Sequence, residues 1–180
     1  MPPEITIRRA SAADIPAIWD IRTRAIIQTC SSHYAPALID AWVRNPMPGG
    51  FSSFVETEPF FVASVGQSLV GFAALKRASS EIDAVFVCPT FTRHGLGMRL
   101  LSHLESVATA LGLYRLKLDA SLNAVPFYQA AGYEVGHGGV HVAQSGLQIP
   151  CMHMEKRLHS AAGVQQVAQA DGPASGGSAA

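Results

Sequence analysis

The sequence predicts a single α+β domain with a mixed, mostly antiparallel sheet flanked by helices. Several short segments alternate apolar and polar residues, as strands with one buried face do. Other segments repeat apolar residues at helical spacing, and turn residues separate the two kinds of segment. In chain order the segments read β-α-α-β-β-β-α-β-α-β-β, without an internal repeat.

The first half of the chain accounts for the first five of these elements. A strand is predicted over 4–9, helices over 11–27 and 35–45, and a hairpin over 59–65 and 68–75. Ser11 and Asp14 form a capping-box pattern at the start of the first helix. The proline and glycine residues of 46–50 end the second helix.

The second half begins with the sixth element and contains the rest. We expect strands over 81–87, 114–121, 133–138 and 147–158, and helices over 95–112 and 124–132. The last 22 residues, 159–180, are rich in Ala, Gly, Ser and Gln, so they cannot bury enough apolar area to offset their ordering entropy. We therefore predict a folded domain over 1–158 and a disordered tail after it.

Composition excludes several classes of protein. The 180 residues are 48% hydrophobic, and 13 basic residues balance 13 acidic ones, so we expect neither a nucleic-acid partner nor a membrane partner. Cys30, Cys88 and Cys151 are too few and too widely spaced for a disulfide framework or a zinc motif. Because the N-terminus lacks an apolar signal core, a cytoplasmic location is expected.

The stretch "VCPTFTRHGLGMRLL", residues 87–101, joins a predicted strand to a predicted helix through a glycine-containing turn. Backbone N–H groups at a helix N-terminus bind anions, and Arg93 and His94 add local positive charge. Gly95 and Gly97 let a bulky phosphate approach the backbone. The turn therefore suggests a pyrophosphate site, while a tight connection without a ligand stays open. Leu100 stands where a Rossmann fingerprint needs its third glycine.

This stretch resembles the acyl-CoA pyrophosphate loop of the GCN5-related N-acetyltransferases (GNAT). The family motif is Q/R-x-x-G-x-G/A after a strand with V-x-P, and "TRHGLG" departs from it at Thr92. The segment "NAVPFYQAAGY", 123–133, is similar to a second family motif, N-x-x-A-x-x-F-Y-x-x-x-G-F/Y, although Asn123 and Ala124 are adjacent here. The resemblance covers roughly residues 5–158.

The resemblance implies acetyl-CoA as a cosubstrate and no metal. Its pyrophosphate would meet the loop amides, and its pantetheine arm would meet the end of the preceding strand and Asn123. The cofactor-binding residues implied in this way are Val85, Phe86, Val87, Arg93, His94, Gly95, Leu96, Gly97, Met98, Asn123 and Phe127. Arg99, one helical turn further on, is more typical of a solvated surface arginine.

The implied reaction is attack by a substrate amine on a thioester, which needs a base to deprotonate the amine. Glu81 lies fourteen residues before Gly95, the position of the catalytic glutamate in the histone-acetylating branch of the family. Asp83 is a second candidate, and strand alternation places both carboxylates on one face with Val85 and Val87. Ile82, Ala84 and Phe86 would share the other face. Solvated carboxylates at a strand start, with water as the base, remain the alternative.

Tyr128 matches the position of the family's general acid. A phenol is protonated at neutral pH, so it can donate a proton to a leaving thiolate. The alternative is a packing role on a short amphipathic helix, but Phe127 suits that role better.

The resemblance implies that the first two helices and the connection between the last strands shape the acceptor site. These segments contain Trp19, Arg22, His33, Tyr34, Trp42 and residues 136–146. Trp19 and Trp42 sit at helical spacing, which favours a place in the core. His141 and His153 are expected near each other on the last two strands, without a metal motif.

The partner expected is therefore an amine acceptor, either a small molecule or a protein. A homodimer stays open. The alternative function is a non-catalytic acetyl-CoA-binding sensor on the same fold.

Overall fold

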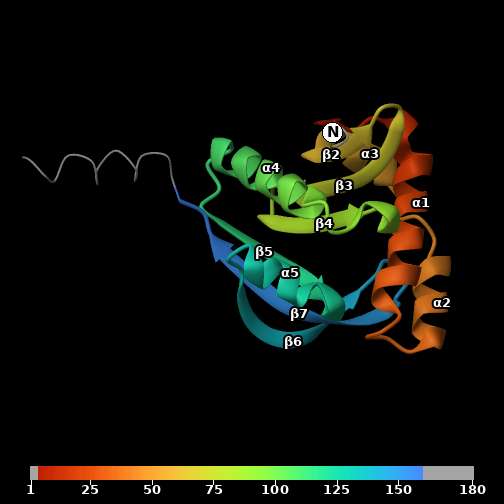
Figure 1. Cartoon of the computed structure of the whole chain (residues 1–180). Coiled ribbons are helices and arrows are strands. Elements are labelled where there is room, and N and C mark those ends of the chain that lie inside the picture. Colours follow the sequence, from red (N-terminus) through yellow and green to blue (C-terminus); the bar gives the residue numbers. More distant parts are fainter. Residues whose placement is uncertain (1–3, 160–180) are drawn as a thin grey trace, which may run out of the picture.

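The computed structural model describes residues 4–159, which form a seven-stranded sheet with helices on both faces (Figure 1). The strands are β1 (Ile5–Arg9), β2 (Phe60–Val65), β3 (Ser68–Lys76), β4 (Glu81–Val87), β5 (Arg115–Ser121), β6 (Glu134–Val142) and β7 (Gln148–Arg157). The helices are α1 (Ile15–Ala25), α2 (Pro36–Arg44), α3 (Phe51–Thr57), α4 (Leu96–Ala110) and α5 (Val125–Ala130). Apart from His159, the tail predicted over 159–180 lies outside the described residues.

The sheet order is β1-β2-β3-β4-β5-β7-β6, and the pairs are antiparallel except for β4 with β5. The predicted fold class and element order are confirmed, with one addition: the short helix α3 was not predicted. No helix within residues 4–159 is long and apolar enough to span a bilayer.

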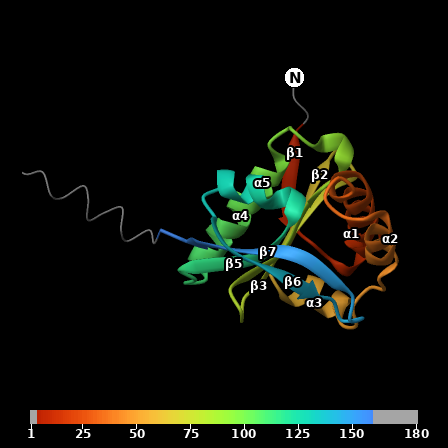
Figure 2. The ribbon, with the colours of Figure 1, turned by 90° about the horizontal axis from the view of Figure 1, so that it is seen from below.

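Helices cover both faces of the sheet. Figure 2 shows α4 and α5 on one side of the strands and α1 and α2 on the other. The larger core lies under α4, where Leu100, Leu101 and Leu104 are almost fully buried. A second core under α1 and α3 contains Ile18 and Phe60. Because each face has its own core, the side to which a strand residue points decides which helices it meets.

Strand β4 contains a bulge at Asp83. On β3, Ala74 pairs with Ala84 while Leu75 pairs with Ile82, so Asp83 is an extra residue without a partner on β3. The prediction that alternation runs unbroken through β4 is therefore wrong.

The bulge reassigns the side chains of β4 to the two faces. Ile82, Val85 and Val87 pack on the α4 side. Ala84 and Phe86 pack on the α1 side. Glu81 and Asp83 precede the shift, so they face the α1 side with Phe86 instead of sharing a face with the two valines.

Strands β4 and β5 diverge soon after they meet (Figure 1). Within the described residues, their ladder consists of the single pair Glu81 and Lys117, next to a hydrogen bond from the Lys117 amide to the Ser80 carbonyl of 3.0 Å. Beyond this point, the edge of β4 that faces β5 has no strand partner. Backbone groups there are available to a ligand, as predicted for Val87.

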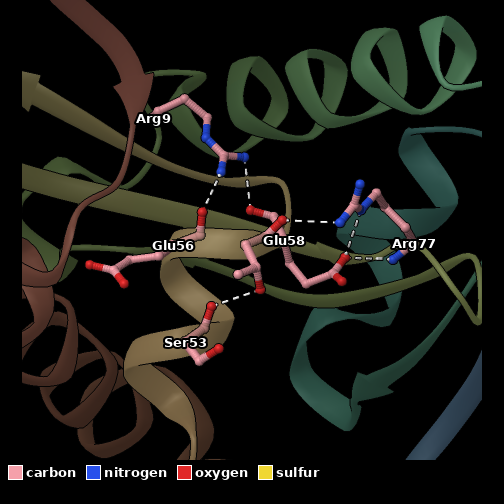
Figure 3. Close-up of polar contacts among 6 residues, drawn as sticks. Arg9, Ser53, Glu56, Glu58 and Arg77 are labelled. Atoms are coloured by element: carbon pink, nitrogen blue, oxygen red, sulfur yellow. Dashed lines mark hydrogen bonds and ion pairs between the residues drawn. The ribbon is translucent and has the colours of Figure 1, made fainter.

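Helix α3 is held at its C-terminal end by two arginines (Figure 3). Arg9 of β1 donates to the carbonyl oxygens of Glu58 at 2.8 Å and Glu56 at 3.1 Å. The backbone amide of Arg77 donates to the Glu58 carboxylate at 2.9 Å, and its guanidinium donates to the Thr57 carbonyl at 3.1 Å. These bonds satisfy carbonyl groups that a helix end otherwise leaves free.

The predicted capping box is present, on the short 3-10 turn Ala12–Asp14 that leads into α1. The Ser11 amide donates to the Asp14 carboxylate at 2.9 Å, and the Arg8 guanidinium donates to both carboxylate oxygens at 2.8 and 2.9 Å. The Arg8 hydrogen bonds outweigh burial and lower the pKa of Asp14 to about 2. Asp14 thus joins β1 to the first helix as an ion.

We predict that Asp14→Asn lowers the free energy of unfolding by about 1 to 2 kcal/mol at pH 7. Because the folded-state pKa is lowered, this stabilisation is complete above the unfolded value of 3.8 and is lost as the pH falls toward 2. Urea unfolding at pH 7 and at pH 2.5 checks this, with the exposed Asp20→Asn as the control. An equal loss at both pH values would show that packing, and not charge, is responsible.

Candidate functional site

A cavity of about 480 Å³ lies against the α1 side of β4 and reaches the start of α5. Its walls come from α1, the segment around α3, strands β3, β4 and β5, and the β6–β7 connection. All three predicted catalytic residues, Glu81, Asp83 and Tyr128, line it.

Three carboxylates in this cavity surround one ammonium group. Lys76 on β3 forms an ion pair with Asp83, and it also feels the charges of Glu81 and Asp119. Burial acts to lower the pKa of Lys76, but the attraction of the carboxylates exceeds it and the pKa is raised. Three negative charges against one positive charge leave this part of the cavity acidic, which suits an ammonium ligand.

The two predicted bases differ in their surroundings. Asp83 is committed to its ion pair with Lys76. Glu81 contacts only the Ser79 hydroxyl, which donates to its carboxylate at 3.5 Å, and it has no ion-pair partner within residues 4–159. Glu81 is thus the freer of the two carboxylates.

Tyr128 reaches the cavity from the first turns of α5. Its ring packs edge-on against Phe127 and Tyr133, with centroids 5.0 and 5.6 Å away, and 7% of the residue is exposed. Burial raises the pKa of Tyr128, so the phenol keeps its proton at neutral pH.

The predicted pyrophosphate loop turns sharply into α4. Arg93 and Gly95 both have positive φ, 67° and 71°, and Gly95 is the N-cap of the helix. The His94 ring donates from Nδ1 to the Thr92 carbonyl at 2.9 Å. A Cβ built on Gly95 has open space around it, so nothing obstructs an anion at the helix N-terminus.

The structure gives Gly97 a packing role in place of the predicted close approach of a phosphate. A Cβ at this position would lie 3.1 Å from the Phe127 ring and 3.6 Å from a Val87 methyl group. Gly97 therefore allows α5 to pack against the start of α4. The side chain of Leu96 is buried in the core, so only the backbone amide of this residue is available to a ligand. Arg99 donates to the Ile5 carbonyl at 3.2 Å, which ties α4 to β1.

Asn123 lies in the turn between β5 and α5. Its Oδ1 is buried without a hydrogen-bond partner in the described part of the chain, and its side chain lies against the Cys30 thiol. An orphaned buried amide oxygen is costly, and a ligand amide could satisfy it.

Asp119 was missed by sequence reasoning. It accepts hydrogen bonds from Nδ1 of both His141 and His153, the first at 3.5 Å, so the two histidines meet as predicted. A Cβ on Gly139 would clash with the His153 ring, so this glycine makes room for the ring. The alternation of 115–121 could have placed Asp119 on the face opposite the buried Leu118, but nothing in the sequence marked its partners.

Asp119, His153 and Cys151 also form the one group in the described chain whose atoms could hold a metal ion, all within 4.8 Å of one another. Burial raises the pKa of the Cys151 thiol, and the charge of Asp119 adds to this effect.

The predicted acceptor residues divide into two sets. Trp19, Arg22 and Trp42 line the cavity, together with residues 141–144 of the β6–β7 connection. Both tryptophans are half-buried and form cavity walls, but Trp42 also packs against the core around Tyr34 and Ile39, so the prediction of a core position is wrong for Trp19 only. His33 is exposed and lies away from the cavity.

Tyr34 is structural. It is buried, and its hydroxyl donates to the Pro150 carbonyl at 2.7 Å and accepts from the Leu122 amide at 2.9 Å.

Comparison with known proteins agrees with this geometry. A model of the acetyltransferase (GNAT) domain matches residues 33–158. The chain is 31% identical over 130 residues to the uncharacterized N-acetyltransferase YafP of Escherichia coli K12, covering 72% of this chain and 81% of YafP.

Solved structures share the fold. A GCN5-related N-acetyltransferase from Rhodopseudomonas palustris has a TM-score of 0.79 at 26% identity, covering 88% of this chain and 99% of that one. The acetyltransferase yncA from Salmonella typhimurium, solved with acetyl-CoA, has a TM-score of 0.64 at 22% identity, covering 87% and 95%. With its loop, its diverging strands and these relatives, the chain belongs to the GNAT family of N-acetyltransferases.

Proposed function

We propose that this protein transfers the acetyl group of acetyl-CoA to a primary amine by direct attack within a ternary complex. The observation that carries the proposal is one cavity that joins the protonated Tyr128 hydroxyl to the free Glu81 carboxylate, at the point where β4 and β5 separate. A binding module without catalysis would not need both groups in one cavity.

The residues present fit acetyl-CoA. The amides of residues 93–98 at the start of α4 would hold its pyrophosphate. The unpaired edge of β4 at 85–87 and the orphaned Asn123 oxygen would pair with the amides of its pantetheine arm. The solved fold relative that contains acetyl-CoA supports this assignment.

The reaction forms a C–N bond and breaks a C–S bond. The neutral amine attacks the thioester carbonyl carbon and gives up a proton, which Glu81 accepts directly or through water. The departing sulfur takes a proton from the Tyr128 hydroxyl. Asp83 is already paired with Lys76, so its role would be to hold Lys76 in place. Glu81 and Asp119 would then keep the cavity acidic.

The first test concerns the loop. At about 100 times its dissociation constant, acetyl-CoA should stabilise the protein by about 2.7 kcal/mol, a rise in Tm of roughly 5 to 10 °C. Gly95→Asp should abolish this rise through charge repulsion. Gly95→Asn, which tolerates the same backbone conformation without the charge, should keep most of it. No rise in the wild type, measured by thermal denaturation, would remove acetyl-CoA from the proposal.

The second test concerns the acid. Tyr128→Phe should lower kcat about 100-fold, because only the proton donor is lost, and should leave the affinity for acetyl-CoA nearly unchanged. Tyr133→Phe is the matched control, a buried phenol outside the cavity. Release of free thiol with a reactive amine measures both variants. Equal kcat values for Tyr128→Phe and the wild type would assign the proton to water.

The third test separates the two carboxylates. Glu81→Gln should lower kcat at least 10-fold at pH 7, with part of the activity recovered at high pH, where more of the free amine is neutral. Asp83→Asn should have the smaller effect on kcat, because Asp83 is already paired with Lys76. The reverse order in pH–rate profiles would make Asp83 the base.

A further inference from the structure

Arg22 is the cavity residue that the proposed chemistry leaves unused. It projects from α1, and one guanidinium nitrogen, Nη2, donates to the Trp42 carbonyl at 3.1 Å. Its guanidinium carbon lies 4.4 Å from the centroid of the Trp19 ring. The other terminal nitrogen, Nη1, is buried without a hydrogen-bond partner in the described part of the chain. A charged donor in this condition is destabilising until something pairs with it.

Arg22 also lacks a counter-ion. None of the ion pairs within residues 4–159 includes it, although neighbouring arginines of α1 and α2 each have an aspartate partner. Burial lowers the pKa of Arg22, and no carboxylate acts in the opposite direction. The acidic groups of the cavity are gathered around Lys76 instead. The cavity therefore offers an excess of negative charge in one place and an unpaired positive charge in another.

We propose that the acceptor is an amine that also carries a carboxylate, and that Arg22 binds this carboxylate. Its ammonium end would be drawn to the acidic group near Glu81, while its anionic end would pair with the Arg22 guanidinium, which lines the same cavity. The inference rests on the proposed acetyl transfer and specifies the substrate class of that same site.

The number of free donors favours a carboxylate over a phosphate. Arg22 has one terminal nitrogen without a partner, and the second cation of the cavity, Lys76, is paired with Asp83. A phosphate dianion would keep a second charge without a partner in a partly buried site. A single carboxylate charge matches the single unpaired arginine.

The rest of the wall describes the body of the acceptor. Trp19, Trp42, Phe51 and Phe54 line the cavity, and Trp19 meets Phe51 edge-on at 5.7 Å. The loop before α3 closes over this region through a hydrogen bond of 3.1 Å from the Gly49 amide to the Gln144 side chain. An apolar or aromatic side chain between amine and carboxylate fits these walls, as in an amino acid.

The test measures free thiol release with paired amines. Apolar and aromatic amino acids are compared with their amides, which keep the amine and lose the carboxylate, and glucosamine and ethanolamine are compared with their phosphate esters. We expect kcat/KM to be about 10- to 100-fold higher for the acids than for the amides. A preference for the phosphate esters would overturn the carboxylate assignment.

Variants show whether Arg22 is responsible. Arg22→Gln should bring the ratio of acid to amide close to one, and Arg22→Lys should restore part of it. Arg44→Gln, an exposed arginine on α2, should leave the ratio as it is in the wild type. The wild-type ratio needs no variant to fold, so the inference can be tested even if Arg22→Gln is unstable.

The outcomes separate this inference from the proposed function. Turnover of the amides at a rate equal to or above that of the acids overturns the inference and leaves acetyl transfer standing, with a peptide amine as the acceptor. Absence of thiol release with every amine overturns acetyl transfer itself, and the inference with it.

Discussion

The site depends on the early separation of β4 from β5. Two parallel neighbours in the middle of a sheet would ordinarily hydrogen-bond along their length, but here pairing stops at Glu81 and Lys117. The strands then part, and their backbone groups face open space where another strand would lie. Because the α4 core and the cores on the other face continue to hold the strands from both sides, the separation does not unfold the sheet. It leaves a slot with the N-terminal end of α4 beside it.

The bulge at Asp83 decides which side chains of β4 face the cavity. One extra residue on β4 leaves Glu81 and Asp83 on the side of α1 while Val85 and Val87 pack under α4. The same strand can therefore present its carboxylates to the cavity and its apolar side chains to the core. The acidic group and the aromatic walls belong to one cavity, whereas the turn at Arg93 to Gly95 leads into α4 on the other face.

Much of this arrangement could be predicted from the sequence, and the reasons for the failures are physical. The element order, the loop at 93–98 and the capping box of Asp14 rest on local patterns, and the structure contains all three. Helix α3 is only seven residues long and is held by Arg9 of β1 and by Arg77 in the turn after β3, so no local sequence pattern predicts it. The bulge at Asp83 leaves no mark in the segment "EIDAVFV", because polar and apolar residues alternate there as they do in a regular strand.

The candidate site was predicted best where a motif spans a few neighbouring residues. The resemblance to the GNAT family singled out Tyr128 and Glu81, and both line the cavity. Asp119 could not be identified from the sequence, because the two histidines that donate to it come from β6 and β7. The buried, unpaired nitrogen of Arg22 is likewise a property of packing, which the residue type alone does not reveal.

The close contact between Gly97 and Phe127 has a consequence for the choice of acyl donor. The N-terminal end of α4 packs on the ring of Phe127, and the next residue along the chain is Tyr128. The distance between the amides at the start of α4 and the Tyr128 phenol therefore depends on this one packing contact. If these amides hold the pyrophosphate as proposed, the contact also fixes how far from its phosphates the sulfur of a thioester donor must lie to reach the phenol.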